Sequence, residues 1–322
     1  VQSIFAETPE VADDELTDPT IDTIGASITF RDLHFRYAPA LPEVFSGFSA
    51  EIPPGATIGI LGRTGCGKST LVSLLTRLYN VEPGQIFIGG KDIRSIPIGV
   101  LRENLACVPQ ENLLFSDTIQ ANIAFGTRTA EHMPQVETKP LKVFLRSDEA
   151  ADQWVEQEMA HRESQTDALW NDLDQVIQAA KDADVHDNIM EFPHQYATVV
   201  GERGVTLSGG QKQRTAIARA LLKDAEILIL DDALSAVDTD TEARILAALK
   251  SRRKGKTTIL IAHRISTVPS ADRILFVENG ICAESGTHQE LMALGGSYAR
   301  LYEQQQLELQ LQAEKEALHA EE

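Results

Sequence analysis

The chain has 322 residues, of which 43% are hydrophobic and 24% are charged; these proportions are those of a folded globular protein and exclude general disorder. Its 48 acidic and 29 basic residues give a formal net charge of −19. Sequence-independent binding to nucleic acid needs cations that neutralise phosphates, so this balance argues against a nucleic-acid partner. The 3 cysteines make no even disulfide framework, which favours a reducing compartment.

The first part of the chain indicates a linker followed by two strands. Residues 1–26 are acidic and are interrupted by Pro9 and Pro19, as is typical of a linker. Apolar side chains alternate over residues 27–37, and this period of two predicts a half-buried strand. Residues 48–52 predict a second strand, which a Pro-Pro-Gly turn ends.

Short apolar segments rich in β-branched residues predict the buried strands of a parallel sheet. They lie at residues 57–61, 227–230 and 257–261. Leucines at helical spacing follow the first of them over residues 68–79, and a second amphipathic helix is predicted at 239–250, between the other two. This alternation of strands and helices predicts an α/β fold.

The C-terminal part predicts a hairpin and a helix. Residues 273–277 and 280–284 flank Asn279-Gly280, a dipeptide typical of hairpin turns. The tail at 301–322 is rich in Glu, Gln and Leu. We interpret it as a helical tail that packs on the domain or contacts the tail of a partner.

Residues 62–69 read Gly-Arg-Thr-Gly-Cys-Gly-Lys-Ser and fit the phosphate-loop pattern between a predicted strand and a predicted helix. The glycines let backbone N–H groups converge on phosphate oxygens, Lys68 supplies a cation, and Ser69 supplies an oxygen ligand for Mg²⁺. The alternative is a glycine-rich turn before an ordinary helix. The residues predicted to bind the nucleotide here are Gly62, Arg63, Thr64, Gly65, Cys66, Gly67, Lys68, Ser69 and Thr70.

Two further segments fit a nucleotide site. Asp231 follows the predicted strand at 227–230, where a carboxylate either holds Mg²⁺ or caps a turn. Leu-Ser-Gly-Gly-Gln at 207–211 opens a helical run at 213–222 and predicts either a second anion-binding helix start or a well-capped helix. One domain does not need two cradles for a γ-phosphate, so we interpret the second as serving a nucleotide bound to another chain. Its candidate residues are Ser208, Gly209, Gly210 and Gln211.

These motifs, in this order and at these distances, resemble those of the ATPase domain of an ABC transporter. The resemblance covers residues 27–300 except an insertion at about 127–168, which is acidic and polar and has no strand pattern. It implies ATP and Mg²⁺ as ligands. It also implies an α/β fold of the P-loop NTPase type, with an antiparallel β subdomain and a helical subdomain at about 111–222.

The resemblance assigns roles to residues outside the two glycine-rich segments. It implies that Tyr37 stacks on adenine, that Gln110 touches Mg²⁺ and the attacking water, and that His263 contacts the γ-phosphate as a catalytic residue. It also matches residues 235–238 with the D-loop, which crosses the dimer interface. Without the resemblance, Tyr37 is interpreted as a half-buried strand residue and His263 as a packed or capping residue.

Two patterns are similar to those of exporters in this family. Residues 200–204 resemble the X-loop, and a spaced pattern of Phe, Thr, Asn and Gly over 115–126 is similar as well. The start of the chain resembles the connector that follows a last transmembrane helix. We therefore expect a membrane domain before Val1, transmembrane domains as partners and a location at the cytoplasmic face of the cell membrane.

Asp232 departs from the family pattern, which has Glu as the residue that polarises the attacking water. The shorter side chain keeps a carboxylate, but a misplacement of about 1 Å can cost roughly 100-fold in rate. We interpret the chain as half of a heterodimeric exporter whose own site is slow. Its Leu-Ser-Gly-Gly-Gln segment at 207–211, the signature of the family, completes the site of a second, non-identical ABC ATPase subunit in a head-to-tail dimer. The alternatives are a tolerated change with activity retained, a regulatory half that binds nucleotide without hydrolysing it, and a soluble ABC ATPase.

The cysteines offer one candidate for chemical modification. Cys66 lies beside Lys68 at a predicted helix start, and both features lower the pKa of a thiol. We predict that alkylation of Cys66 blocks nucleotide binding and that bound ATP protects it; the alternative is an inert small residue. Cys107 and Cys282 lie in predicted strands, where they are expected to pack.

Overall fold

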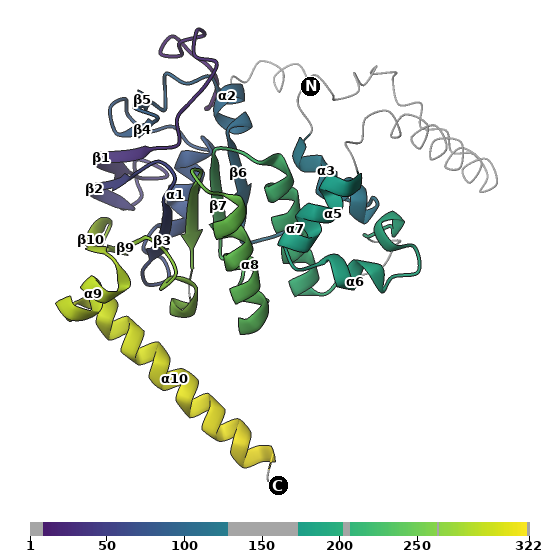
Figure 1. The fold of residues 1–322 in the computed structure, drawn as a ribbon. Coiled ribbons are helices and arrows are strands. Elements are labelled where there is room, and N and C mark those ends of the chain that lie inside the picture. The colour runs from purple at the N-terminus through teal and green to yellow at the C-terminus, as the bar shows by residue number, and fades with distance from the viewer. Residues whose placement is uncertain (1–8, 128–172, 202–206, 263, 321–322) are drawn as a thin grey trace, which may run out of the picture.

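A computed structural model describes residues 9–127, 173–201, 207–262 and 264–320, which form two sheets with helices around the larger one (Figure 1). The larger, six-stranded sheet has the order β10-β9-β3-β8-β7-β6, and the smaller, four-stranded sheet has the order β2-β1-β4-β5. The strands of the larger sheet are β3 (Thr57–Leu61), β6 (Leu105–Val108), β7 (Ile227–Asp231), β8 (Thr257–Ile261), β9 (Arg273–Glu278) and β10 (Ile281–Gly286). Those of the smaller sheet are β1 (Ile28–Phe35), β2 (Phe45–Ile52), β4 (Ile86–Ile88) and β5 (Lys91–Asp92).

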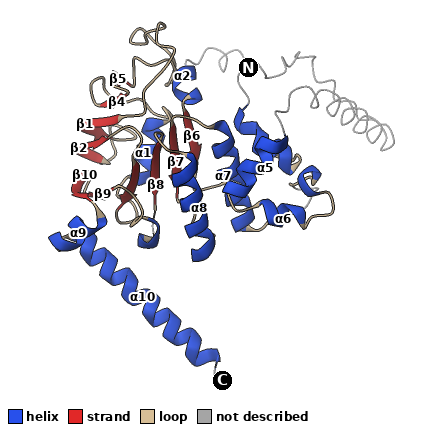
Figure 2. Ribbon diagram, viewed as in Figure 1, coloured by secondary structure: helices blue, strands red, loops and turns tan. Residues whose placement is uncertain are grey.

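The larger sheet lies between the smaller sheet on one side and a group of helices on the other (Figure 2). That group consists of α3 (Ile119–Ala124), α5 (Leu173–Asp182), α6 (His186–Met190) and α7 (Gly209–Lys223). The other α-helices described are α1 (Lys68–Leu75), α2 (Ile98–Glu103), α8 (Thr239–Arg252), α9 (His288–Leu294) and α10 (Ser297–Ala320). Short 3-10 turns are η2 (Phe125–Thr127), η4 (Gln195–Ala197) and η5 (Ile265–Thr267).

The strands predicted from apolar runs are confirmed. β3 pairs in parallel with β8 and β9, and β7 pairs in parallel with β8 and β6. Every residue of β7 and β8 is buried, which explains why their sequences do not alternate. The predicted hairpin is confirmed too: β10 pairs antiparallel with β9, and Asn279 and Gly280 have φ angles of 51° and 76°, as a type I′ turn requires. The strand predicted at 48–52 begins earlier, at Phe45.

The helix predicted over residues 68–79 ends at Leu75, so the last turn of that prediction is wrong. Arg77 takes a left-handed conformation with a φ of 49°. Its N–H and that of Leu78 donate back to carbonyl oxygens in the last turn, at 3.1 and 2.8 Å. This pair of bonds is a Schellman cap, which stops the helix. Leu78, which the predicted pattern placed on the apolar face, is therefore 59% exposed.

The spaced pattern over residues 115–126 is explained by packing against α7. Asn122 is fully buried. Its side-chain amide donates to the Phe115 carbonyl (3.0 Å), and its Oδ1 accepts from Arg219 of α7 (3.0 Å). A Cβ on Gly126 would lie 2.2 Å from the Arg219 carbonyl oxygen, so a side chain there would clash with the helix backbone. Asn122 and Gly126, two residues of this pattern, therefore let α3 and η2 pack against α7.

The acidic segment before β1, which the sequence predicts as a linker, is bonded to the domain over its described part. Ile21 and Ile24 belong to the same buried cluster as the apolar residues of β1. The Asp18 N–H donates to the Ser95 carbonyl (2.8 Å). These contacts fix the path of the chain as it approaches β1.

Arg77 ties this segment to the end of α1. Its side chain is 1% exposed and donates to the carbonyl oxygens of Ile96 (2.9 Å) and Ala12 (3.2 Å). Burial lowers the pKa of the guanidinium, and nearby Asp13 opposes that shift. Without this side chain, both carbonyl groups would lose a charged donor.

We expect Arg77→Met to lower the free energy of unfolding by about 1–3 kcal/mol, because the buried Ile96 carbonyl would lose its charged donor and a buried polar group left without a partner costs about that much. Denaturant unfolding followed by circular dichroism measures the loss. Arg300→Met is the matched control, since Arg300 is exposed and donates to the Ser297 hydroxyl at the surface. Equal losses for the two variants would contradict the prediction.

Helix α10 starts against the domain and then extends away from it (Figure 1). Tyr298 in its first turn is fully buried, with its hydroxyl 2.7 Å from His288 Nδ1. Gln305 Oε1 accepts from the Ile265 N–H (2.9 Å), whereas Leu307 is 57% exposed. The first turns of the tail therefore pack on the domain.

Some predicted features lie outside the described residues. The insertion predicted at about 127–168 is one of them, apart from its first residue. Among the helices that the structure describes, none combines the length and the apolar character needed to cross a membrane.

Candidate nucleotide-binding site

The carboxyl ends of the parallel strands place most of the predicted motifs along one edge of the larger sheet. The phosphate loop follows β3, Gln110 lies two residues after β6, Asp231 is the last residue of β7, and Asp232 comes next. Ligands of open α/β sheets bind in the crevice at this edge. His263 lies outside the described residues, so its contact with a γ-phosphate stays a prediction.

The phosphate loop needs glycine at several of its positions. Gly62, Gly65 and Gly67 have φ angles of 154°, 83° and 101°. A Cβ on Gly62 would lie 2.3 Å from the Val277 carbonyl oxygen, and a Cβ on Gly67 would lie 2.8 Å from the side chain of Val44. Gly67 is also the N-cap of α1, where it offers no side chain to cover the first N–H groups. The helix start is therefore open to an anion.

Lys68 folds back over the phosphate loop. It is 4% exposed, and its Nζ donates to the carbonyl oxygens of Gly62 (2.9 Å) and Arg63 (3.2 Å). Burial lowers the pKa of the ammonium, while the charges of Asp231 and Asp232 oppose the shift. The ammonium is thus held at the phosphate loop, at the edge of the sheet where phosphates would bind.

Tyr37 is held beside the first turn of α1. Its hydroxyl lies 2.9 Å from Thr70 Oγ1, and its ring meets Tyr79 edge-on, with centroids 5.0 Å apart. Tyr37 is 43% exposed, so an aromatic surface is available for a base next to the phosphate loop. Sequence reasoning missed Tyr79 because the predicted helix counted it as the end of a helical pattern.

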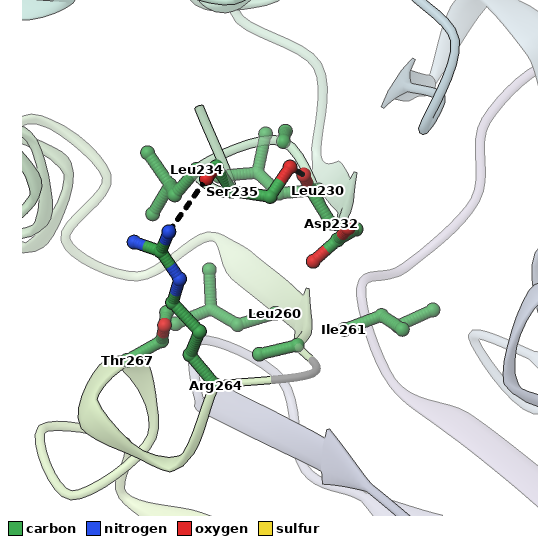
Figure 3. Close-up of a pocket in the computed structure, with 10 residues that line it drawn as sticks. Leu230, Asp232, Leu234, Ser235, Leu260, Ile261, Arg264 and Thr267 are labelled. Atoms are coloured by element: carbon green, nitrogen blue, oxygen red, sulfur yellow. Dashed lines mark hydrogen bonds between the residues drawn. The ribbon is translucent and has the colours of Figure 1, made fainter. Parts of the chain in front are cut away.

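Asp231 and Asp232 lie where β7 ends beside β8. Asp231 is 5% exposed. The Asp232 N–H donates to the Ile261 carbonyl (2.9 Å), and Asp232 has a φ of 51°. Asp232, Ser235 and Arg264 lie around a cavity of about 10 Å³ (Figure 3), which is close to the least space that one water molecule needs.

The oxygen donors at this edge fit a magnesium ion. Mg²⁺ is usually held in proteins by one or two carboxylates together with substrate phosphates. Ser69 at the start of α1 is exposed, and Asp231 supplies a carboxylate at the end of β7. Among the described residues, no group of His, Cys, Asp and Glu makes a metal site by itself, so an ion here would depend on the phosphates.

The second glycine-rich segment starts α7. Ser208 is the N-cap: its Oγ accepts from the Gln211 N–H (3.2 Å), and Gln211 Oε1 accepts from the Ser208 N–H (2.9 Å). The well-capped helix is therefore present. Gly209 remains exposed, and a Cβ on Gly210 would lie 2.8 Å from the Ala236 carbonyl oxygen. This close approach seats the helix start on the segment predicted as the D-loop.

Sequence reasoning missed two side chains that fix residues 235–238. Arg264 donates to the carbonyl oxygens of Ser235 (2.9 Å) and Val237 (3.3 Å), and Gln213 bonds the same segment from α7. In the sequence, Arg264 and Gln213 are distinguished only by lying close to the predicted motifs. Asp238 has a structural role, because its Oδ1 accepts from the Thr241 N–H (2.9 Å) at the start of α8.

The described start of the predicted X-loop lies against the segment that follows Gln110. The Val200 N–H donates to the Asp117 carbonyl (2.9 Å), and a Cβ on Gly201 would lie 2.4 Å from Ser116 Oγ. Residues 202–204 lie outside the described residues. A contact of this loop with transmembrane helices stays a prediction.

Cys66 does not have the lowered pKa that the sequence predicts. Burial raises the pKa of its thiol, and the nearby charge of Lys68 offsets this only in part. Cys107 and Cys282 pack against the core as expected, burial raises the pKa of Cys107 to about 12, and all three cysteines are free.

We expect iodoacetamide to modify Cys66 more slowly at neutral pH than it modifies glutathione, and faster as the pH rises, because only the thiolate reacts. Mg²⁺-ATP is expected to slow the reaction further by covering the loop. Mass spectrometry of the Cys66 peptide measures the rate. A neutral-pH rate above that of glutathione would mean that the charge of Lys68 outweighs burial.

Comparisons with known proteins agree with this geometry. The sequence pattern that describes the family "ABC transporter" matches residues 45–235, more than half of the chain. The chain belongs to the ABC transporter family. As an ABC ATPase domain, it has the predicted fold class: a P-loop NTPase core with antiparallel and helical parts.

The relatives of this ABC domain include exporters. The chain is 43% identical over 278 residues to the ATP-dependent lipid A-core flippase of Saccharophagus degradans, covering 86% of this chain and 40% of the flippase. It is 37% identical over 293 residues to ABC transporter B family member 24, mitochondrial, of Arabidopsis thaliana, covering 91% of this chain and 37% of the relative.

A solved structure of a bacterial Atm1-family ABC exporter with ATP bound superposes with a TM-score of 0.77 at 36% identity, covering 94% of this chain and 46% of that one. The predicted resemblance to ABC exporters is confirmed. The chain spans less than half the length of each of these relatives.

Proposed function

We propose that this chain binds ATP with Mg²⁺ and hydrolyses it to power export across a membrane, from the cytoplasmic face. The observation that carries the proposal is that the phosphate loop, which follows β3, and Asp231, which ends β7, lie at the same edge of the larger sheet. Lys68 is bonded to the loop, and the charges of Asp231 and Asp232 act on it. A triphosphate in this crevice would have a cation and helix N–H groups on one side and a metal-holding carboxylate on the other.

Binding would use residues that the fold already orients. Lys68 would exchange its bonds to the loop carbonyls for bonds to the β- and γ-phosphates, and Tyr37 would stack on the adenine. Ser69, Asp231 and Gln110 would hold Mg²⁺, which would neutralise charge on the phosphates. The hydrogen bond between Tyr37 and Thr70 would keep the base contact beside the helix start that contacts the phosphates.

Hydrolysis would depend on how Asp232 reaches a water molecule. A general base must lie within hydrogen-bond distance of that water, and the carboxylate of Asp232 is shorter than Glu by one methylene. The backbone of Asp232 is held by the Ile261 carbonyl, so it is not free to advance. Because the carboxylate of Asp232 falls short of the water, hydrolysis at this chain's own site would be slow. Gln110 and His263 would assist at the water and at the γ-phosphate.

The start of α7 would serve a nucleotide bound to another subunit. In this chain it rests on residues 235–238, whereas the phosphate loop rests on β9 and on the start of β2. Two subunits arranged head to tail would each place a phosphate loop opposite a signature. Because this chain has an intact signature and a shortened base, we infer a non-identical partner with Glu at the matching position, in addition to the transmembrane domains.

The test uses the assembled transporter with its partner. Asp232→Ala is expected to change ATP turnover little, because hydrolysis mainly uses the partner's site, while loss of the partner's Glu stops it. If Asp232→Ala stops turnover as completely, or if the native transporter contains two identical copies of this chain, the asymmetric arrangement is wrong.

A regulatory half that binds ATP without hydrolysing it is the second candidate, and Asp232 is the observation that favours it. A single-turnover experiment separates the two. With the partner's Glu removed and excess protein over ATP, slow release of phosphate supports a slow catalytic site. Bound ATP that stays intact supports the regulatory half.

A further inference from the structure

Gln213 is a buried amide that connects α7 with residues 235–238. It is 7% exposed. Its Nε2 donates to Ser235 Oγ (3.0 Å), and its Oε1 accepts from the Ala236 N–H (2.9 Å). Both ends of the amide are therefore used on two successive residues of one loop. A side chain that merely filled space there would need neither end.

The same loop holds the backbone of Asp232. Ser235 Oγ donates to the Asp232 carbonyl (2.8 Å), and the Ser235 N–H donates to the same oxygen (3.2 Å). Asp232 needs such support because its φ of 51° is a conformation that non-glycine residues adopt only when their surroundings impose it. Gln213 bonds Ser235, and Ser235 bonds Asp232, so one chain of hydrogen bonds runs from α7 to the candidate base.

The two ends of this series of hydrogen bonds face different nucleotides in the proposed dimer. Gln213 lies one turn into α7, whose start, at Ser208 and Gly209, would contact the partner's nucleotide. Asp232 would act on the nucleotide held by this chain's own phosphate loop. A shift of α7 toward or away from a γ-phosphate would therefore change the bonds that hold Asp232.

We propose that Gln213 is a positioning residue that couples the two nucleotide sites through Ser235, which rests on the proposed ATPase function. It touches neither nucleotide. It sets the conformation of residues 235–238 and of the Asp232 backbone according to the position of α7. Binding at the partner's site thereby controls the base at this chain's site.

Three variants separate this role from simple packing. Gln213→Met keeps the length of the side chain and removes both hydrogen bonds. Gln213→Glu keeps an acceptor for the Ala236 N–H and removes the donor to Ser235. Ser235→Ala removes the next link. Lys212→Ala is the matched control, because Lys212 is the exposed neighbour on the same helix.

The measurement is the slow ATP hydrolysis at this chain's own site in the assembled transporter, with the partner's Glu removed so that the fast site is silent, over a range of ATP concentrations, together with the melting temperature of each variant. We expect Gln213→Met to lower kcat about tenfold, as misplaced catalytic groups do, to leave KM for ATP unchanged, and to abolish cooperativity in ATP. Gln213→Glu should show a smaller loss. Gln213→Met and Ser235→Ala combined should cost no more than either alone, because residues of one network are not additive.

The outcomes decide the proposal. Folded Gln213 variants with the kcat and cooperativity of Lys212→Ala would overturn it, and so would losses that add in the double variant. If Gln213→Met does not fold, Gln213→Glu alone and combined with Ser235→Ala gives the same decision. A parent transporter that hydrolyses no ATP would instead refute the proposed function, so the two failures are distinguishable.

Discussion

Replacing Lys68 with alanine is expected to weaken ATP binding at this chain's site about 100-fold. The ammonium would lose its charged hydrogen bonds to the phosphates, each worth about 1.5–3 kcal/mol, and every 1.4 kcal/mol is tenfold in affinity. The effect is large because Lys68 is 4% exposed, so little water is available to replace the cation. Equilibrium binding of Mg²⁺-ATP measures it, with the partner's own phosphate-loop lysine replaced so that one site is observed.

Two controls make the Lys68 result specific. Lys254→Ala removes the same charge from an exposed position and should leave the affinity unchanged. Lys68→Met keeps most of the methylene chain and shows whether the loop survives without the bonds to Gly62 and Arg63. If Lys68→Ala binds ATP as tightly as Lys254→Ala, the phosphates do not lie in this loop.

The strands that carry the site were predictable because their signal is local. β3, β7 and β8 are short apolar runs followed directly by the residues of interest, and burial on both faces of a parallel sheet requires such runs. The phosphate loop was predictable for the same reason, since strand, glycines and helix are contiguous. Fold class and family followed from these segments.

The end of α1 was not predictable, because its cause is a backbone conformation that composition does not encode. Arg77 adopts a positive φ, which glycine or asparagine would have signalled. Its side chain is held by the carbonyl oxygens of Ile96 and Ala12, which are far away in sequence. The same distance hid the path of the acidic segment before β1, whose charges indicated a solvated linker while Ile21 and Ile24 pack into the core.

The chemistry of single side chains depended on tertiary burial. Neighbours in the sequence predicted a low pKa for Cys66, but desolvation is the larger effect and reverses the sign. The links between motifs were hidden too. Gln213 and Ser235 are 22 residues apart, and no spacing rule joins them. Motifs can thus be read one by one, whereas their coupling requires the structure.

Asp232→Glu is expected to raise single-turnover hydrolysis at this chain's own site about 100-fold. The added methylene moves the carboxylate roughly 1 Å or more toward the attacking water, and that distance is worth about two orders of magnitude in rate. The backbone stays in place, because the Ile261 carbonyl and Ser235 hold residue 232. Release of phosphate from excess protein, with the partner's Glu removed, measures the rate.

The melting temperature of Asp232→Glu should fall while its rate of hydrolysis rises, and this separates a gain in catalysis from a general gain in stability. Glu accepts the left-handed conformation of residue 232 less readily than Asp does, so we expect a slightly lower melting temperature for Asp232→Glu. Asp187→Glu, the same change at an exposed position, should alter neither property, and Asp232→Asn should lower hydrolysis further. If Asp232→Glu hydrolyses ATP no faster than the parent, the carboxylate of Asp232 already reaches the water, and the shorter side chain is a tolerated change rather than the cause of a slow site.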